Sequence, residues 1–245
     1  MRAEINITNE RRFFTKVILS VYLLWIPAFV SVGFYASTLP SHNLETTVDR
    51  NIPFVPELIW IYMGCYVLPL LSILLVIDWH RFNSMLLSFT IANLTAFIVY
   101  LVFPVTFQKP ELGRSVAEQF LSIHYRMPTS ASNNFPSMHV TFVWLYYFMC
   151  CGQRLNKMGD ALMLVLIVLI TLSTLFVKIH LVADVAAGIL LALITFAFAK
   201  YLYPHMVDSQ TEASVAFGQI VRKMITGVLM FVTFLVLIMG LGRRV

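Results

Sequence analysis

Two short stretches of this chain carry residues that can do chemistry. Residues 134–139 read Asn-Phe-Pro-Ser-Met-His and end at His139. Residues 173–184 place His180 and Asp184 four positions apart. Each histidine lies beside the end of a long apolar run, and ionisable groups in such places are costly in a membrane and usually functional. The two stretches therefore predict a site at a membrane surface, and their residue types suggest phosphoryl chemistry.

The second stretch has the composition of an activated nucleophile. On a helix, His180 and Asp184 share one face, and a carboxylate that accepts from one ring nitrogen leaves the other nitrogen free to attack. His139 follows a Pro-Ser pair that suits the first turn of a helix. The free amides of that turn, with the Ser137 hydroxyl, favour a phosphate. His139 is then placed to protonate a leaving oxygen or to take a proton from water.

Phosphoryl transfer also needs positive charge around the transferred group. Lys109 and Lys178 are the best candidates, and a lysine in this role acts as a point charge. Arg114 and Arg126 lie in the same predicted loop as Lys109 and could contribute.

The composition indicates the setting of these residues. Of the 245 residues, 59% are hydrophobic and only 12% are charged, and the mean hydropathy is +0.82, whereas an ordinary globular domain has about 25% charged residues. The chain is therefore expected to be one integral membrane domain over residues 1–245 that contacts the lipid bilayer, with its motif core at 105–190. The net charge of +5 is scattered and forms no basic stripe, so no nucleic-acid partner is expected. The sequence leaves the oligomeric state open.

Seven apolar stretches approach the length of about 20 residues that crosses a bilayer. Helices are expected, because lipid offers backbone polar groups no other partner, so the predicted fold is an all-α polytopic membrane helix bundle. The expected spans are Phe13–Thr38, Phe54–Trp79, Ser84–Pro104, Pro136–Cys151, Ala161–Lys178, Leu181–Tyr203 and Met224–Leu241.

The distribution of Lys and Arg predicts the orientation. With the N-terminus in the cytoplasm, ten of the 17 basic residues lie inside and seven outside. The same arrangement brings both motifs to the outer face of the cell (plasma or inner) membrane. The last span leaves Arg243 and Arg244 outside, which the rule disfavours.

These motifs resemble those of the type 2 phosphatidic acid phosphatase (PAP2) superfamily. Its second signature is Pro-Ser-Gly-His, which residues 136–139 resemble, and its third is Ser-Arg, five residues, His, three residues, Asp, which residues 173–184 resemble with the same spacing. The resemblance implies a six-helix core, to which residues 224–241 add a probable C-terminal span, and it implies no metal or cofactor. It also implies that His180 forms a phosphohistidine, Asp184 orients it, His139 is the acid and base, and Ser173 contacts the substrate.

The chain departs from the superfamily pattern at three points. The first signature is Lys, six residues, Arg-Pro; Lys109 precedes a proline here, but the leading lysine position is Val102. Met138 replaces the glycine of the second signature, and Thr174 replaces the arginine of the third. Lys178, four residues later, could bring a cation to the same helix face. These forms are closest to the inositol-phosphorylceramide-synthase-like branch, which transfers phosphorylated head groups between lipids.

The leading hypothesis is a phosphatase that cleaves a phosphomonoester or pyrophosphate of a membrane lipid at the outer face. A transferase with the same chemistry and an alcohol acceptor comes second. Two other interpretations are a metal site formed by the two histidines and the aspartate and a transporter or scaffold without enzymatic activity. The remaining histidines have no motif and are expected to be ordinary interfacial side chains; they are His42, His80, His124 and His205.

Overall fold

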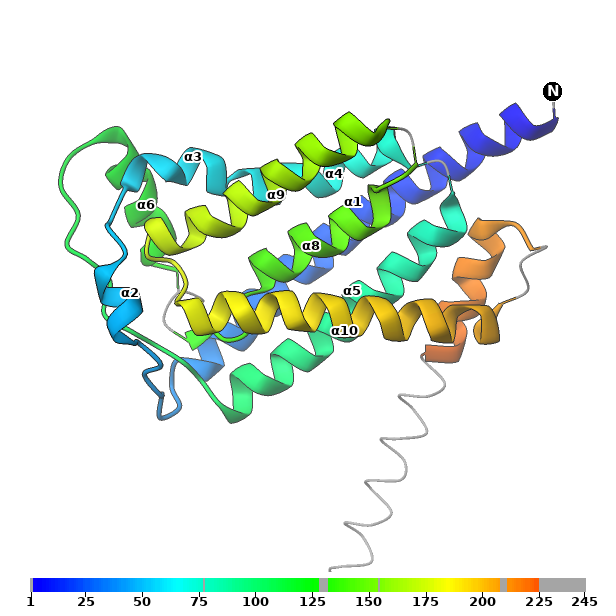
Figure 1. Ribbon diagram of the computed structural model, residues 1–245. Helices are drawn as coiled ribbons and strands as arrows, with labels where there is room; N and C mark the ends of the chain where they lie inside the picture. Colours follow the sequence, from blue (N-terminus) through cyan, green and yellow to red (C-terminus); the bar gives the residue numbers. More distant parts are fainter. Residues whose placement is uncertain (1, 77, 128–131, 154, 208–210, 225–245) are drawn as a thin grey trace, which may run out of the picture.

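Long apolar helices run side by side along most of the molecule (Figure 1). The computed structural model describes residues 2–76, 78–127, 132–153, 155–207 and 211–224, and the regular elements within those ranges are helical. These are α1 (Arg2–Ala36), α2 (Thr47–Asn51), η1 (Pro56–Leu58), α3 (Ile59–Tyr62), α4 (Gly64–Leu75), α5 (Trp79–Val102), α6 (Val116–Tyr125), α8 (Met138–Cys150), α9 (Lys157–Phe176) and α10 (Val182–Met206). Residues 213–224 form a further helical segment.

Polar caps determine where the helices of the bundle begin. The Asp78 carboxylate accepts from the backbone amides of His80 and Arg81 at 3.0 and 3.1 Å, so α5 starts five residues earlier than the apolar pattern predicts. Asn156 caps α9, and the Ser137 hydroxyl caps α8. Such caps satisfy amides that have no partner within the helix.

Within the described residues, four helices are long and apolar enough to cross a membrane: Asn9–Ala36, Trp79–Val102, Lys157–Phe176 and Val182–Met206. The apolar helical segments Pro56–Leu68 and Met138–Cys150 are shorter. The predicted all-helical membrane bundle is therefore confirmed. Apart from Met224, the candidate extra span at 224–241 lies outside the described residues.

The second predicted span, Phe54–Trp79, differs from the expectation of one continuous helix. The chain turns at Met63 between α3 and α4, and α4 ends at Leu75. At Gly64, the first residue of α4, a Cβ atom would lie 2.8 Å from Cδ1 of Ile170, so the glycine leaves room for that side chain of α9. Apolarity alone did not reveal this break, because the residues on both sides of it are equally apolar.

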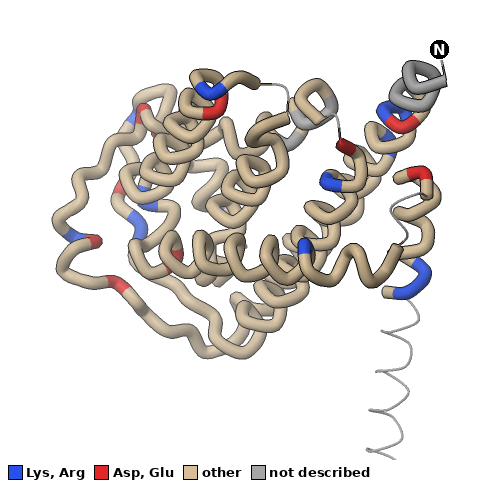
Figure 2. The backbone as a smooth tube through the Cα atoms, turned by 45° about the vertical axis from the view of Figure 1, so that its right-hand side comes forward, with Lys and Arg blue, Asp and Glu red and all other residues tan. Residues whose placement is uncertain are grey.

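Helix α8 lies at the centre and packs against α4, α5, α9 and α10. Its Val140, Val143 and Leu145 are completely buried. The outer helices expose large apolar side chains such as Leu23 (74% exposed) and Leu162 (62%), and a surface of this kind suits lipid rather than water. Charged residues lie mainly toward the two ends of the long helices (Figure 2).

One end of the bundle brings together the start of α8, the end of α9 and the start of α10, with α2, α3 and α6 around them (Figure 1). The start of α1 and residues 213–224 lie at the other end. Backbone bonds hold the connecting segments in place: Val105 bridges to both His42 and Asn133, and the Val55 amide donates to the Phe176 carbonyl at 3.0 Å. These ties position the segments that carry both motifs.

Candidate active site

The three residues predicted to do the chemistry come together at this end. His139 is in the first turn of α8, His180 is in the linker between α9 and α10, and Asp184 is in the first turn of α10. Nδ1 of His139 lies 3.0 Å from Nε2 of His180. On the other side of that ring, Nδ1 of His180 lies 3.5 Å from Oδ2 of Asp184. His180 is 4% exposed and Asp184 is fully buried.

His180 and Asp184 were expected to share one face of a helix, but the structure brings them together in another way. Helix α10 begins at Val182, so His180 stands two residues before it. The Asp184 carboxylate turns back to accept from the Leu181 amide at 2.8 Å, which places it against the His180 ring. Among the described residues, Nδ1 of His180 and Oδ1 of Asp184 are buried without a hydrogen-bond partner, so the contact between the two side chains is electrostatic.

The linker that carries His180 is fixed from outside by α2. The Asp49 carboxylate accepts from the Val182 amide at 2.7 Å and from the Thr46 amide and hydroxyl. Burial raises the pKa of Asp49, but these bonds together outweigh it and hold the pKa below its ordinary value. A buried anion therefore anchors the start of α10 beside the histidines.

The helices α8 and α10 touch backbone to backbone next to the site. The Ser137 amide donates to the Asp184 carbonyl at 3.0 Å, and the Thr141 hydroxyl donates to the Gly188 carbonyl at 3.0 Å. A Cβ at Gly188 would lie only 2.6 Å from the Ser137 carbonyl oxygen. The glycine thus permits the close approach that sets His139 opposite His180.

Lys109 reaches the same linker from the segment before α6. Its Nζ donates to the Ile179 carbonyl at 3.0 Å and lies 3.6 Å from the centre of the Phe107 ring. Burial lowers the pKa of Lys109 to about 7, and the Asp184 charge only partly opposes this. The Lys109 side chain is thus partly protonated near pH 7, and it lines the polar cavity together with His180.

Lys178 does not lie on the helix face expected for it, because α9 ends at Phe176. Its φ is 51°, in the left-handed region that costs a side-chain-bearing residue roughly 1–2 kcal/mol. Its Nζ donates to the Asp49 carbonyl at 2.6 Å. Burial lowers the pKa of Lys178, although Asp49 and Glu45 oppose the shift.

The other predicted phosphate-binding residues are placed differently. The Ser173 hydroxyl donates to the Ile170 carbonyl at 2.7 Å within its own helix, and the Ser137 hydroxyl accepts from the Val140 amide as the α8 cap. Arg114 and Arg126 are exposed on either side of α6. Arg126 lines a separate open cavity of about 440 Å³. Of this group, Lys109 and Lys178 line the polar cavity together with His180, and Ser137 lies beside His139 and Asp184.

Two cavities of opposite character meet at His180. A polar cavity of about 510 Å³ is lined by His180 together with Lys109, Lys178, Arg50, Glu45, Asp49 and Glu111, among others. An apolar cavity of about 310 Å³ is lined by both His139 and His180 and by side chains such as Trp25, Phe29, Met63, Phe120 and Ile123. His180 thus lines both a charged cavity and an apolar one.

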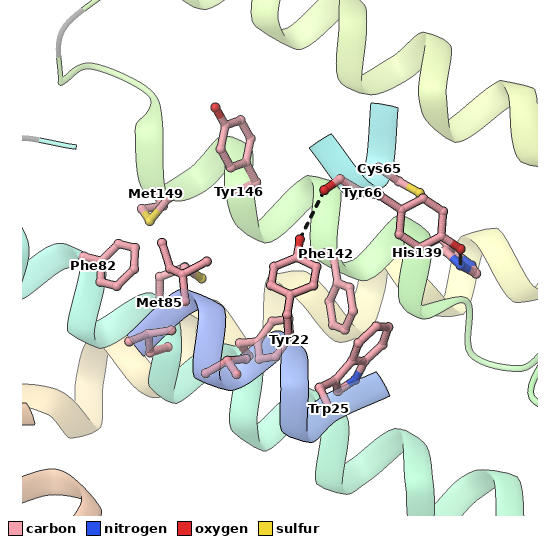
Figure 3. Close-up of a pocket in the computed structure, with 14 residues that line it drawn as sticks. Tyr22, Trp25, Cys65, Tyr66, Phe82, Met85, His139, Phe142, Tyr146 and Met149 are labelled. Atoms are coloured by element: carbon pink, nitrogen blue, oxygen red, sulfur yellow. Dashed lines mark hydrogen bonds between the residues drawn. The ribbon is translucent and has the colours of Figure 1, made fainter. Parts of the chain in front are cut away.

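A third, smaller cavity of about 60 Å³ lies beside the apolar one. It shares Trp25, Tyr66 and His139 with the larger apolar cavity. Apart from these residues its lining is mostly apolar, with Phe82, Phe142 and two methionines around it (Figure 3). His139 therefore lines both apolar cavities.

Three residues of the site carry no motif and were missed by sequence reasoning. Nε2 of His139 lies 2.9 Å from the hydroxyls of both Tyr62 and Tyr66, and Nε2 of His124 lies 3.4 Å from the Tyr62 hydroxyl. His124 is not an ordinary interfacial side chain: burial, with His180 and Lys109 nearby, lowers its pKa to about 3. The only signal in the sequence was the four-residue spacing of the tyrosines, and helices contain many such pairs.

A sequence model of the PAP2 superfamily matches residues 39–198, which include both motifs and Lys109. The chain belongs to the PAP2 superfamily. That superfamily generally comprises phosphatases and phosphotransferases, which indicates an activity of this type for the chain. No curated protein and no solved structure matched the sequence.

The sequence left open a metal site formed by the two histidines and the aspartate. In the part of the chain that the structure describes, no group of three or more His, Cys, Asp or Glu side chains is arranged to hold a metal ion. The ring nitrogens of His139 and His180 that face each other are within hydrogen-bond distance of one another.

Proposed function

We propose that this PAP2 protein is a membrane lipid phosphatase that hydrolyses a lipid phosphomonoester or pyrophosphate through a phosphohistidine on His180. One observation carries the proposal. His180 lines both a charged cavity and an apolar cavity, with Nδ1 of His139 3.0 Å from its Nε2 and the Asp184 carboxylate on the other side of the ring. A phosphate that joins a polar end to an apolar chain fits this junction.

In the first step, Nε2 of His180 attacks the phosphorus atom. The bond between phosphorus and the lipid oxygen breaks, and that oxygen takes the proton from Nδ1 of His139. Asp184 keeps a proton on Nδ1 of His180 and stabilises the positive charge that develops on the ring. The products of this step are a lipid alcohol and a phosphorylated enzyme.

In the second step, a water oxygen attacks the phosphorus of the phosphohistidine. The nitrogen–phosphorus bond breaks, and a water proton passes to Nδ1 of His139, which restores the acid for the next cycle. The net reaction converts a lipid phosphate and water into a lipid alcohol and phosphate. In both steps the transferred proton leaves or enters at Nδ1 of His139, the ring nitrogen that faces His180.

The cations proposed for the transferred group are Lys109 and Lys178, which line the polar cavity beside His180. Positive charge close to the equatorial oxygens stabilises the transition state of phosphoryl transfer. Lys109 has the stronger case, because its Nζ is bound at the Ile179 carbonyl, next to His180. Lys178 is bound to α2 and would have to release the Asp49 carbonyl to reach a phosphate.

The apolar cavity supports a lipid as the substrate. Its lining includes exposed residues of α1 and of the α6 region, such as Val30 (38% exposed), Ile123 (60%) and Met127 (45%). An alkyl chain in this cavity would gain about 0.8 kcal/mol for each CH₂ group removed from water. A phosphate bound at His180 could keep its chain in this cavity.

Phosphotransfer to an alcohol remains the second candidate, and the polar cavity favours it. Its volume of about 510 Å³ is many times the roughly 30 Å³ occupied by one water molecule. Its carboxylates and cations could bind the hydroxyl groups of a polar acceptor. The inositol-phosphorylceramide-synthase-like form of the motifs favours the same outcome. Labelled lipid phosphate separates the two candidates: free phosphate supports hydrolysis, and a new polar lipid supports transfer.

The nucleophile is tested by His180→Ala in purified protein. We expect phosphate release or head-group transfer to fall by about 10⁴-fold or more, as for other nucleophile deletions, and acid-labile labelling of the protein to disappear. His205→Ala, at the far end of α10, is the matched control and should retain both. Turnover that survives the loss of His180 would overturn the proposal.

We also propose that the N-terminus is cytoplasmic and that the site faces the outside of the cell membrane. The start of α1 and the site lie at opposite ends of the bundle (Figure 1), which supports this topology together with the distribution of basic residues. In a variant without the three native cysteines, an impermeant thiol reagent should label Gln119→Cys in intact cells. It should label Met158→Cys, at the start of α9, only after permeabilisation. The reverse pattern would place the site in the cytoplasm.

A further inference from the structure

The ring of His139 is contacted at both nitrogens, and only one contact belongs to the proposed chemistry. Nδ1 faces His180, whereas Nε2 faces the hydroxyls of Tyr62 on α3 and Tyr66 on α4, each at 2.9 Å. The two hydroxyls are 3.2 Å apart. Figure 3 shows the Tyr66 side chain reaching His139. The break between α3 and α4 allows both hydroxyls to converge on one atom.

His124 on α6 decides which way the Tyr62 hydroxyl can point. Its Nε2 lies 3.4 Å from the Tyr62 oxygen. Because burial lowers the pKa of His124 to about 3, this ring is neutral near pH 7, and its Nε2 can accept a hydrogen bond. A Tyr62 hydroxyl that donates to His124 leaves its oxygen free to accept from His139.

We propose that Tyr62, Tyr66 and His124 are positioning residues that keep a proton on Nε2 of His139, so that Nδ1 alone gives and takes the proton of the reaction. This inference rests on the proposed function, because it assigns the acid and base of that reaction to a single atom. The three residues touch His139 or each other and do not contact the phosphorus.

The ring nitrogens of His139 carry different protons at different stages of the reaction. In the acid form of His139 both nitrogens carry protons, and Nε2–H needs an acceptor because it is buried; the tyrosine oxygens supply it. After Nδ1 has protonated the leaving oxygen, Nε2–H remains and Nδ1 has a free lone pair for the proton of water. Without the tyrosines, the neutral ring could carry its proton on Nδ1, and its only basic atom would then face away from the substrate.

The kinetic test uses Tyr62→Phe, Tyr66→Phe and the double variant. Phenylalanine keeps the ring packing against His139, where the centroids are 5.1 and 5.6 Å away, and removes only the hydroxyl. We expect the double variant to lower kcat by about 10- to 100-fold, the usual effect of losing a partner that orients a functional histidine, with KM within about twofold. Tyr203→Phe is the matched control, because its hydroxyl binds His80 and Asn83 at the far end of the bundle.

Two further variants separate orientation from packing. His124→Gln keeps an acceptor for the Tyr62 hydroxyl and should retain more of the activity than His124→Leu, which keeps the volume without the acceptor. If Leu and Gln gave the same kcat, the role of His124 would be packing alone.

The decisive readout needs no substrate. Nitrogen-15 NMR of labelled histidine at pH 8 should show Nε2 of His139 protonated in the wild type, and that signal should move to Nδ1 in the double phenylalanine variant. An unchanged tautomer with unchanged kcat overturns this inference and leaves the phosphohistidine proposal standing. Activity that survives in His180→Ala overturns the phosphohistidine proposal, whereas the tautomer result is independent of it.

Discussion

The two sides of His180 are built from different kinds of structure. The polar cavity is formed mainly by α2 and by the segments that connect the helices, with side chains of both charges. The apolar cavity is formed mainly by the flanks of α1, α4 and α6. The first cavity depends on backbone hydrogen bonds to the linker at 177–182, as from Lys109 and Asp49. The second depends on how three helices pack.

This difference suggests that the protein recognises a phosphate and an apolar chain independently. The charged side is tied to His180 through the linker, so a change there should act on every phosphate ester, whatever its chain. On the apolar side, α6 is tied to the linker by the Tyr125 hydroxyl, which donates to the Val177 carbonyl at 2.6 Å, but Tyr125 does not line the apolar cavity. A change there should act according to the length of the chain, and the two kinds of substitution should give separable effects.

Among substitutions on the two sides of His180, the largest effect is expected from Lys109→Met. It removes a cation that is bound to the residue next to His180, and loss of one preorganised charge or donor typically costs about 10²- to 10³-fold in rate. We expect kcat/KM to fall by about this factor for long-chain and short-chain substrates alike, measured by phosphate release. Lys157→Met, at the opposite end of α9, is the control. A loss that grows with chain length would mean that the two cavities are not independent.

A smaller and selective effect is expected from Ile123→Trp on α6. The larger side chain would fill part of the apolar cavity and displace about two or three CH₂ groups of a bound chain, each worth about 0.8 kcal/mol. We therefore expect kcat/KM for long-chain lipid phosphates to fall roughly 30-fold, with soluble short-chain esters within about twofold. Val116→Trp, exposed on the same helix, should be neutral. Equal losses for both substrate classes would contradict a chain-binding role.

The pH dependence should report on the polar side alone. Since burial lowers the pKa of Lys109 to about 7, its ammonium group is mostly charged at pH 6 and mostly neutral at pH 8. Phosphate binding that needs the cation should weaken as the pH rises, so we expect KM to increase about tenfold between pH 6 and 8. Lys109→Arg stays charged throughout this range and should flatten that increase. The same slope in the arginine variant would exclude Lys109 as its source.

The sequence predicted more of the fold than of the surroundings of the site. Long apolar runs determine helices in lipid, so the four long candidate spans agree with the expected ones within several residues. His139, His180 and Asp184 could be singled out because two short motifs beside apolar runs carry them and resemble PAP2 signatures. Tyr62, Tyr66 and His124 were not, because their convergence depends on the turn at Met63 and on the packing of α6, which are tertiary features. The side chain of Lys178 could not be placed from the sequence either, because the apolar pattern did not show that α9 ends at Phe176.

The smallest effect is expected at the two arginines of the α6 region. Arg114 and Arg126 are exposed, and exposed charges a Debye length of roughly 8 Å or more from a ligand are largely screened at physiological salt. We expect Arg114→Gln and Arg126→Gln each to change kcat/KM by less than about twofold, measured with the substrates used for Lys109→Met. A loss of tenfold or more in either variant would show that the α6 region closes over the polar cavity during the reaction. The charged side would then be completed by a segment that packs against the apolar side, and the two halves of the site would be coupled.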